Sequence, residues 1–185
     1  MVEGVLENMP YNLIAISEYT PENLLLIDTV RTDSAGNFRL QKVISSEKIC
    51  YIQFGENLGF PTALNNKTKM ELKIRLSRGG IGYTLEGTNI QSAQNIKTLT
   101  ELNSGYLFKL NALQRQAYGY EQSNPQQMQM AQMQMAQLDN QRSQAVITEM
   151  NNQEPSVAPY FVAKFLLQEP DYKVINEAYE KCKKY

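Results

Sequence analysis

Hydrophobic and polar residues alternate in short runs through the first half of the chain. The clearest run is 70–76, where apolar and charged residues alternate one by one, as in a strand with one packed face and one solvated face. Runs of this kind predict seven strands, at Val2–Leu6, Leu13–Ser17, Leu24–Arg31, Asn37–Leu40, Ile49–Phe54, Met70–Leu76 and Tyr83–Glu86. Their spacing of roughly ten residues favours an antiparallel β-sandwich.

One stretch, Ile27–Gln41, combines two strand-like runs with the turn sequence Asp33-Ser34-Ala35-Gly36 between them. Gly36 can adopt the positive φ that a short loop needs, and Asp33 can accept hydrogen bonds from the backbone ahead of it. The stretch therefore predicts a β-hairpin.

The period of the apolar residues changes after Gly87 from two to about three and a half. A first helical stripe contains Ile96, Leu99, Asn103, Tyr106, Leu110, Leu113, Ala117 and Tyr120. A weaker stripe follows the breaker Ser123-Asn124-Pro125, within a predicted helix at about Gln126–Met150, and contains Met128, Ala131, Met135, Leu138, Arg142, Ala145 and Glu149. Two long helices joined by a short breaker normally pack as an antiparallel hairpin.

Two shorter helices are predicted after the break at Asn151–Pro155, the second of them opening at Pro170. The fold class expected from the whole pattern is α+β: an antiparallel β-sandwich of about seven strands, then a helical part built on a long helix hairpin. The expected domains are the sandwich at 1–87 and the helical part at 88–185, packed together as one unit.

Composition excludes only a few classes of function. The chain has 18 basic and 19 acidic residues, a net charge of −1, which gives no field that would attract nucleic acid or an anionic membrane. No apolar run is long enough to span a bilayer. There is no histidine, so the usual general base and the commonest metal ligand are both missing. The first residues do not resemble a signal peptide, which leaves open a cytoplasmic protein or one whose signal has been removed.

The two cysteines are expected to differ in environment. Cys50 lies in an apolar run and is expected to be a buried, inert thiol, whereas Cys182, between Lys181 and Lys183, is expected to be exposed. A disulfide between them is the less favoured alternative. Neither belongs to a C-x-x-C pair, so dithiol exchange would lack a resolving thiol.

The segment Met128–Gln137 repeats Met-Gln-Met-Ala-Gln twice and offers three interpretations. Packing is favoured, because methionine fills irregular gaps and Met128 and Met135 fall on the apolar stripe. An adaptable binding face comes second, since the glutamine-rich outer surface is nearly neutral. Copper(I) binding comes last, because residues two apart on a helix point in different directions.

Glycine-rich 77–82 fits a hairpin connection better than a phosphate-binding loop, because the lysine of such loops is missing. The sequence thus predicts no catalytic residues, no cofactor and no metal ligands.

Several segments, in this order, resemble one known accessory domain. They are the DTVRTDSAGNFRL segment, the YTLEGT strand that precedes a helix, and the closing helices SVAPYFVAKFLL and DYKVINEAYEKC. The domain has no assigned function and precedes the thioredoxin-like module in cell-envelope thiol-disulfide oxidoreductases of Bacteroidetes (the TlpA/ResA type). The similarity extends over nearly the whole chain.

The resemblance implies a non-catalytic accessory domain that binds, positions or dimerises. Its partner in cis would be a C-terminal thioredoxin-like module with a W-C-x-x-C motif, outside these 185 residues. It further implies a periplasmic or cell-envelope location, membrane attachment only through a lipid anchor outside this chain, and no nucleic-acid partner. A homodimer through the helix hairpin is a second expected interaction. The alternative is a free-standing envelope binding protein that uses the Met-rich helix for a partner or, less favoured, for Cu(I).

Overall fold

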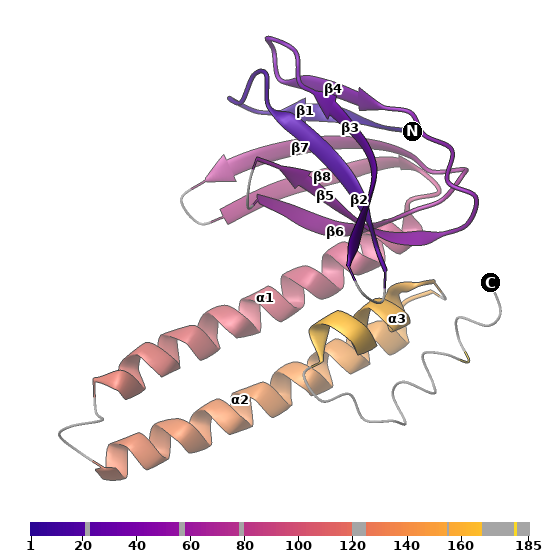
Figure 1. Cartoon of the computed structure of the whole chain (residues 1–185). Coiled ribbons are helices and arrows are strands. Elements are labelled where there is room, and N and C mark those ends of the chain that lie inside the picture. Colours follow the sequence, from indigo (N-terminus) through magenta and orange to yellow (C-terminus); the bar gives the residue numbers. More distant parts are fainter. Residues whose placement is uncertain are drawn as a thin grey trace. The chain divides into compact units, whose positions relative to one another are not determined.

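The computed structural model describes residues 1–20, 23–55, 58–77, 80–119, 125–154, 156–167 and 180 (Figure 1). It divides into two compact units, Met1–Lys97 and Thr98–Tyr185, which are treated separately below. The strands are β1 (Val2–Leu6), β2 (Leu13–Tyr19), β3 (Leu24–Arg31), β4 (Asn37–Leu40), β5 (Lys48–Phe54), β6 (Leu58–Leu64), β7 (Lys69–Ser77) and β8 (Gly80–Thr88). The helices are α1 (Gln91–Tyr118), α2 (Pro125–Asn152), α3 (Ala158–Phe161) and a π-helical segment, η1 (Val162–Leu166).

The strands form two four-stranded sheets, in the orders β4-β1-β7-β8 and β3-β2-β5-β6. One hydrophobic core contains residues of both sheets, as expected for a sandwich. Its buried members include Val2, Leu6, Ile14, Ile16, Phe38, Leu40, Cys50, Ile52, Phe54, Phe60, Leu64, Met70, Leu72 and Ile74. The predicted α+β class and the packing of two sheets as a sandwich are therefore confirmed.

The prediction of seven strands is wrong, because the described residues contain eight. The missed strand is β6, whose Gly59 and Pro61 look like turn residues in the sequence. Pro61 is tolerated because, among the described strands, β6 lies at the edge of its sheet and pairs with β5 alone, where Pro61 lies opposite Tyr51.

The sandwich is also not wholly antiparallel, because β1 pairs in parallel with β7. Gly4 of β1 lies opposite Leu72 of β7. A Cβ atom added to Gly4 would lie 2.1 Å from the Leu72 carbonyl oxygen, so this approach of the two strands requires glycine.

The predicted hairpin at Ile27–Gln41 is wrong, although its turn is correct. Gly36 has φ of 83°, and the Asp33 side chain accepts hydrogen bonds from the backbone N–H groups of Ala35 and Asn37, both at 2.8 Å. The Asn37 side chain also donates to Asp33 Oδ2 at 2.9 Å, and this bond, followed by the backbone bonds, holds the pKa of Asp33 below its usual value. The two flanking strands do not pair, because β3 pairs with β2 and β4 pairs with β1 in the other sheet. The turn therefore carries the chain from one sheet to the other.

Strand β7 confirms the alternation from which it was predicted. Met70, Leu72 and Ile74 are buried, whereas Glu71 and Lys73 are exposed. Strands β7 and β8 pair antiparallel as far as Ser77 opposite Gly80. The glycine-rich segment is thus the connection of a hairpin, and its residues 78–79 lie outside the described part of the chain.

The helical stripes are visible in the burial of the second unit. On α1, Leu99, Asn103 and Ala117 are buried, and Tyr106, Leu110 and Leu113 are partly buried. On α2, the stripe residues Ala131 and Arg142 are buried. Towards the end of α2 the buried residues are Val146 and Met150, each one position after the predicted Ala145 and Glu149, which are only partly buried. Tyr120 and the helix predicted from Pro170 lie outside the described residues.

Candidate functional site

The thiol of Cys50 lies in the sandwich core and has no measurable exposed surface. Burial, and to a lesser degree the charge of Glu18, raises the pKa of this thiol to about 12, against a smaller opposing effect of Lys48. Since only the thiolate is a good nucleophile, Cys50 is unsuited to thiol exchange near neutral pH. The expectation of a buried thiol is confirmed, whereas Cys182 lies outside the described residues.

Labelling should show the inertness of Cys50. In a Cys182→Ser variant, a thiol reagent at pH 8 is expected to react with native Cys50 only as fast as the first unit opens, and at once in denaturant. Rapid labelling of the folded protein would contradict this expectation.

The raised pKa of Cys50 also has a consequence for stability. In the unfolded chain the thiol has its ordinary pKa of 9.0 and loses its proton at a lower pH than in the folded protein. The free energy of unfolding should therefore fall as the pH rises from about 9 towards about 12.

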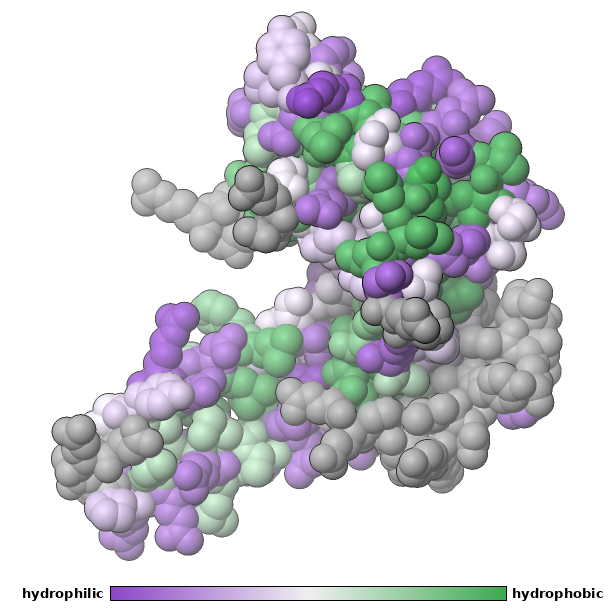
Figure 2. Space-filling model, viewed as in Figure 1, coloured by the Kyte–Doolittle hydropathy of each residue, from purple (hydrophilic) through white to green (hydrophobic). Residues whose placement is uncertain are grey.

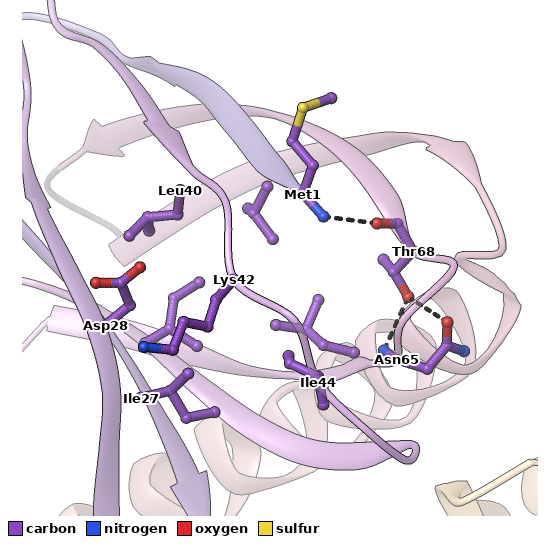
Figure 3. A pocket seen from close by; sticks show the side chains of 11 residues that line it. Met1, Ile27, Asp28, Leu40, Lys42, Ile44, Asn65 and Thr68 are labelled. Carbon is purple, nitrogen blue, oxygen red and sulfur yellow. Dashed lines mark hydrogen bonds between the residues drawn. The ribbon is translucent and has the colours of Figure 1, made fainter.

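A small cavity is lined by residues of both sheets (Figure 3). Asp28 and Lys42 lie on one side of it, and Met1, Thr68 and Asn65 on the other. The polar groups on this second side are paired: the terminal ammonium donates to the Thr68 carbonyl at 2.8 Å, and the Thr68 hydroxyl donates to Asn65 Oδ1 at 3.1 Å. The volume is about 20 Å³, which suits a single water molecule and is far below that of a small-molecule site.

In the helical unit, a buried arginine joins three elements. The Arg142 side chain on α2 is only 3% exposed, and its Nη1 donates to Asn103 Oδ1 of α1 at 2.9 Å and to the Leu166 carbonyl of η1 at 2.6 Å. Its Nε donates to Asp139 Oδ1 at 2.8 Å. Because two of these three hydrogen bonds go to neighbouring helical elements, we assign this network to holding the unit together. In the sequence its only signal was a polar residue within each predicted apolar stripe, Asn103 in the first and Arg142 in the second.

The outer surface of α2 presents a row of uncharged side chains spaced by three and four residues, here called the neutral stripe. Its members are Gln126, Met130, Met133, Gln137, Asn140 and Gln144, and all of them are exposed. Met130 and Met133 are 58% and 67% exposed, which is unusual for large apolar side chains. The favoured packing interpretation therefore holds for the partly buried Met128 and Met135 but not for these two.

An open groove of about 710 Å³ runs along much of the neutral stripe. Its lining residues are Tyr106, Met133, Ala136, Gln137, Asn140, Gln141 and Gln144. None of them is charged, and Ala136 leaves room for close approach of another helix. Figure 2 shows pale green side chains interspersed with purple ones along this unit. The groove has the form of a docking surface for a helix.

In the sandwich, the edge strand β3 presents an exposed apolar surface. Leu24, Leu25 and Leu26 are 45%, 57% and 59% exposed, and Figure 2 shows hydrophobic side chains gathered over this unit. On β2, the strand next to β3, Tyr19 packs edge to face against Tyr51 of β5, with ring centroids 5.9 Å apart. Partial burial raises the pKa of Tyr19 to about 12, so this phenol stays protonated at physiological pH.

Within the described residues, no group of three or more acidic or cysteine side chains is placed to hold a metal ion. None of the described helices is both long enough and apolar enough to cross a bilayer. Comparison of the chain with protein-family models, curated proteins and solved structures gave no match.

Proposed function

We propose that this chain is a non-catalytic accessory domain, with a binding, positioning or dimerising role, in a cell-envelope thiol-disulfide oxidoreductase. The catalytic thioredoxin-like module would follow it in cis, outside these 185 residues. The association with redox chemistry comes from the sequence resemblance, and the binding role comes from the surface of α2.

The neutral stripe carries the binding role. A helix face in contact with water alone normally carries charges, and exposed apolar side chains that gather on one face usually mark an interface. The hydrogen bond between Arg142 and Asn103 supports the further proposal that α1 and α2 pack as an antiparallel hairpin, which would present the stripe on a stiff support.

Insulin reduction tests the non-catalytic assignment. We expect the isolated chain to leave insulin disulfides intact, because its buried thiol has a pKa of about 12 and it lacks a C-x-x-C pair. A longer native protein carrying W-C-x-x-C should reduce insulin, and the matched control is that protein with both cysteines of the motif replaced by serine. Turnover by the isolated chain that disappears in Cys50→Ser would overturn the proposal.

A free-standing envelope binding protein is the second candidate. The exposure of Met130 and Met133 favours it, because methionine-rich surfaces adapt to varied partners. Reading the native coding sequence downstream of Tyr185 separates the two: a thioredoxin-like module supports the first candidate, and its absence supports the second.

A further inference from the structure

We infer that the partner of the neutral stripe is a second copy of this chain, so that α2 forms a symmetric dimer with its counterpart. This inference deepens the binding role proposed above and rests on it, but it does not depend on the redox association. The argument uses the charge pattern of α2, the requirements of twofold symmetry and the chemistry of its amides.

The charges of α2 avoid the stripe. No residue from Pro125 to Leu138 is charged, although 20% of the whole chain is charged. The charged residues of α2 are Asp139, Arg142 and Glu149, none of which belongs to the stripe. Arg142 is buried, and Asp139 forms an ion pair with it. The outer face is thus uncharged over about five helical turns.

Twofold symmetry gives such a face a physical reason. In a symmetric dimer each residue faces a small set of residues that includes its own counterparts, so a charged stripe would place like charges near each other. A different partner would normally be selected by opposite charge, for which this stripe provides nothing. Lack of charge is therefore compatible with self-association, and it gives no basis for recognising an acidic or basic partner.

The side chains of the stripe can also satisfy one another. Glutamine and asparagine amides each donate and accept, so an amide that faces another amide across the twofold axis can be fully hydrogen-bonded. An asparagine such as Asn140 at an interface between helices fixes their register. Met133 and Ala136 supply the apolar contact beside these amides. With so few apolar groups, the dimer should be of micromolar affinity.

A matched pair of isosteric substitutions tests the inference. Gln137→Glu adds one charge on the stripe, and Gln132→Glu adds the same charge on another face of the same helix, where residue 132 lines a separate groove with Met128 and Met135. Both positions are exposed, so neither change should affect folding. The intact chain would be studied by sedimentation equilibrium over a wide micromolar range.

We expect the unmodified chain and Gln132→Glu to dimerise alike, and Gln137→Glu to raise the dissociation constant at least about tenfold. Met133→Glu should have the same effect and serves as a second variant on the stripe. The inference fails if the unmodified chain is monomeric at high micromolar concentration, which would leave the stripe to another partner or to solvent. It also fails if both glutamine variants weaken association equally. Neither result alters the insulin assay, so failure here differs from failure of the redox proposal.

Discussion

Replacing Arg142 with methionine is expected to lower the free energy of unfolding of the helical unit by about 2–4 kcal/mol. Methionine keeps most of the volume but removes three hydrogen bonds. Asn103, which is 7% exposed, and the Leu166 carbonyl would lose the partner that the guanidinium provides. The loss would appear in urea unfolding followed by the circular dichroism of the helices.

Two further variants show whether the network is responsible. Arg115→Met changes an exposed arginine on α1 and should cost less than about 1 kcal/mol. In Arg142→Met the side-chain oxygen of Asn103 is left buried without its hydrogen-bond donor. Adding Asn103→Leu removes this acceptor, so the double variant should recover part of the lost stability. An Arg142→Met protein as stable as the original would show that the network contributes no net stability.

In the sandwich, Leu72→Ala should destabilise the first unit by about 2–5 kcal/mol. Leu72 has no exposed surface and lies at the centre of β7, which pairs with β1 on one side and β8 on the other. Its loss would leave a cavity that the two flanking strands cannot fill without moving. The labelling rate of Cys50 in urea reports on this unit, because the thiol belongs to the same core.

The neighbouring residue is the natural control. Lys73 is exposed on the opposite face of the same strand, so Lys73→Ala should change stability by less than about 0.5 kcal/mol. Equal losses from the two substitutions would contradict the burial pattern of β7.

The elements that the sequence predicted well are those with a local cause. The alternation of β7 and the apolar stripes of α1 and α2 follow from which face is buried, and that information lies within each segment. The Asp33–Gly36 turn was recognised for the same reason, because its backbone hydrogen bonds are formed within five residues.

What the sequence did not predict depends on partners far away along the chain. Nothing local distinguishes a turn that closes a hairpin from one that crosses between sheets, so β3 and β4 were wrongly paired. Pro61 hid β6, because proline is acceptable only where one edge of a strand is unpaired. Two of the three partners of Arg142, Asn103 and Leu166, were hidden because they come from other elements, although a charged residue within a mainly apolar stripe was a usable signal.

The position of β1 in its sheet affects the order in which this unit can assemble. The strand at Val2–Leu6 is bonded to Asn37–Leu40 on one side and, in parallel, to Lys69–Ser77 on the other. The second sheet, β3-β2-β5-β6, pairs segments closer in sequence and can therefore close earlier. Pairing over such long separations carries a loop-closure entropy that slows folding. Within this unit, Val2–Leu6 is therefore among the last strands to find both of its neighbours.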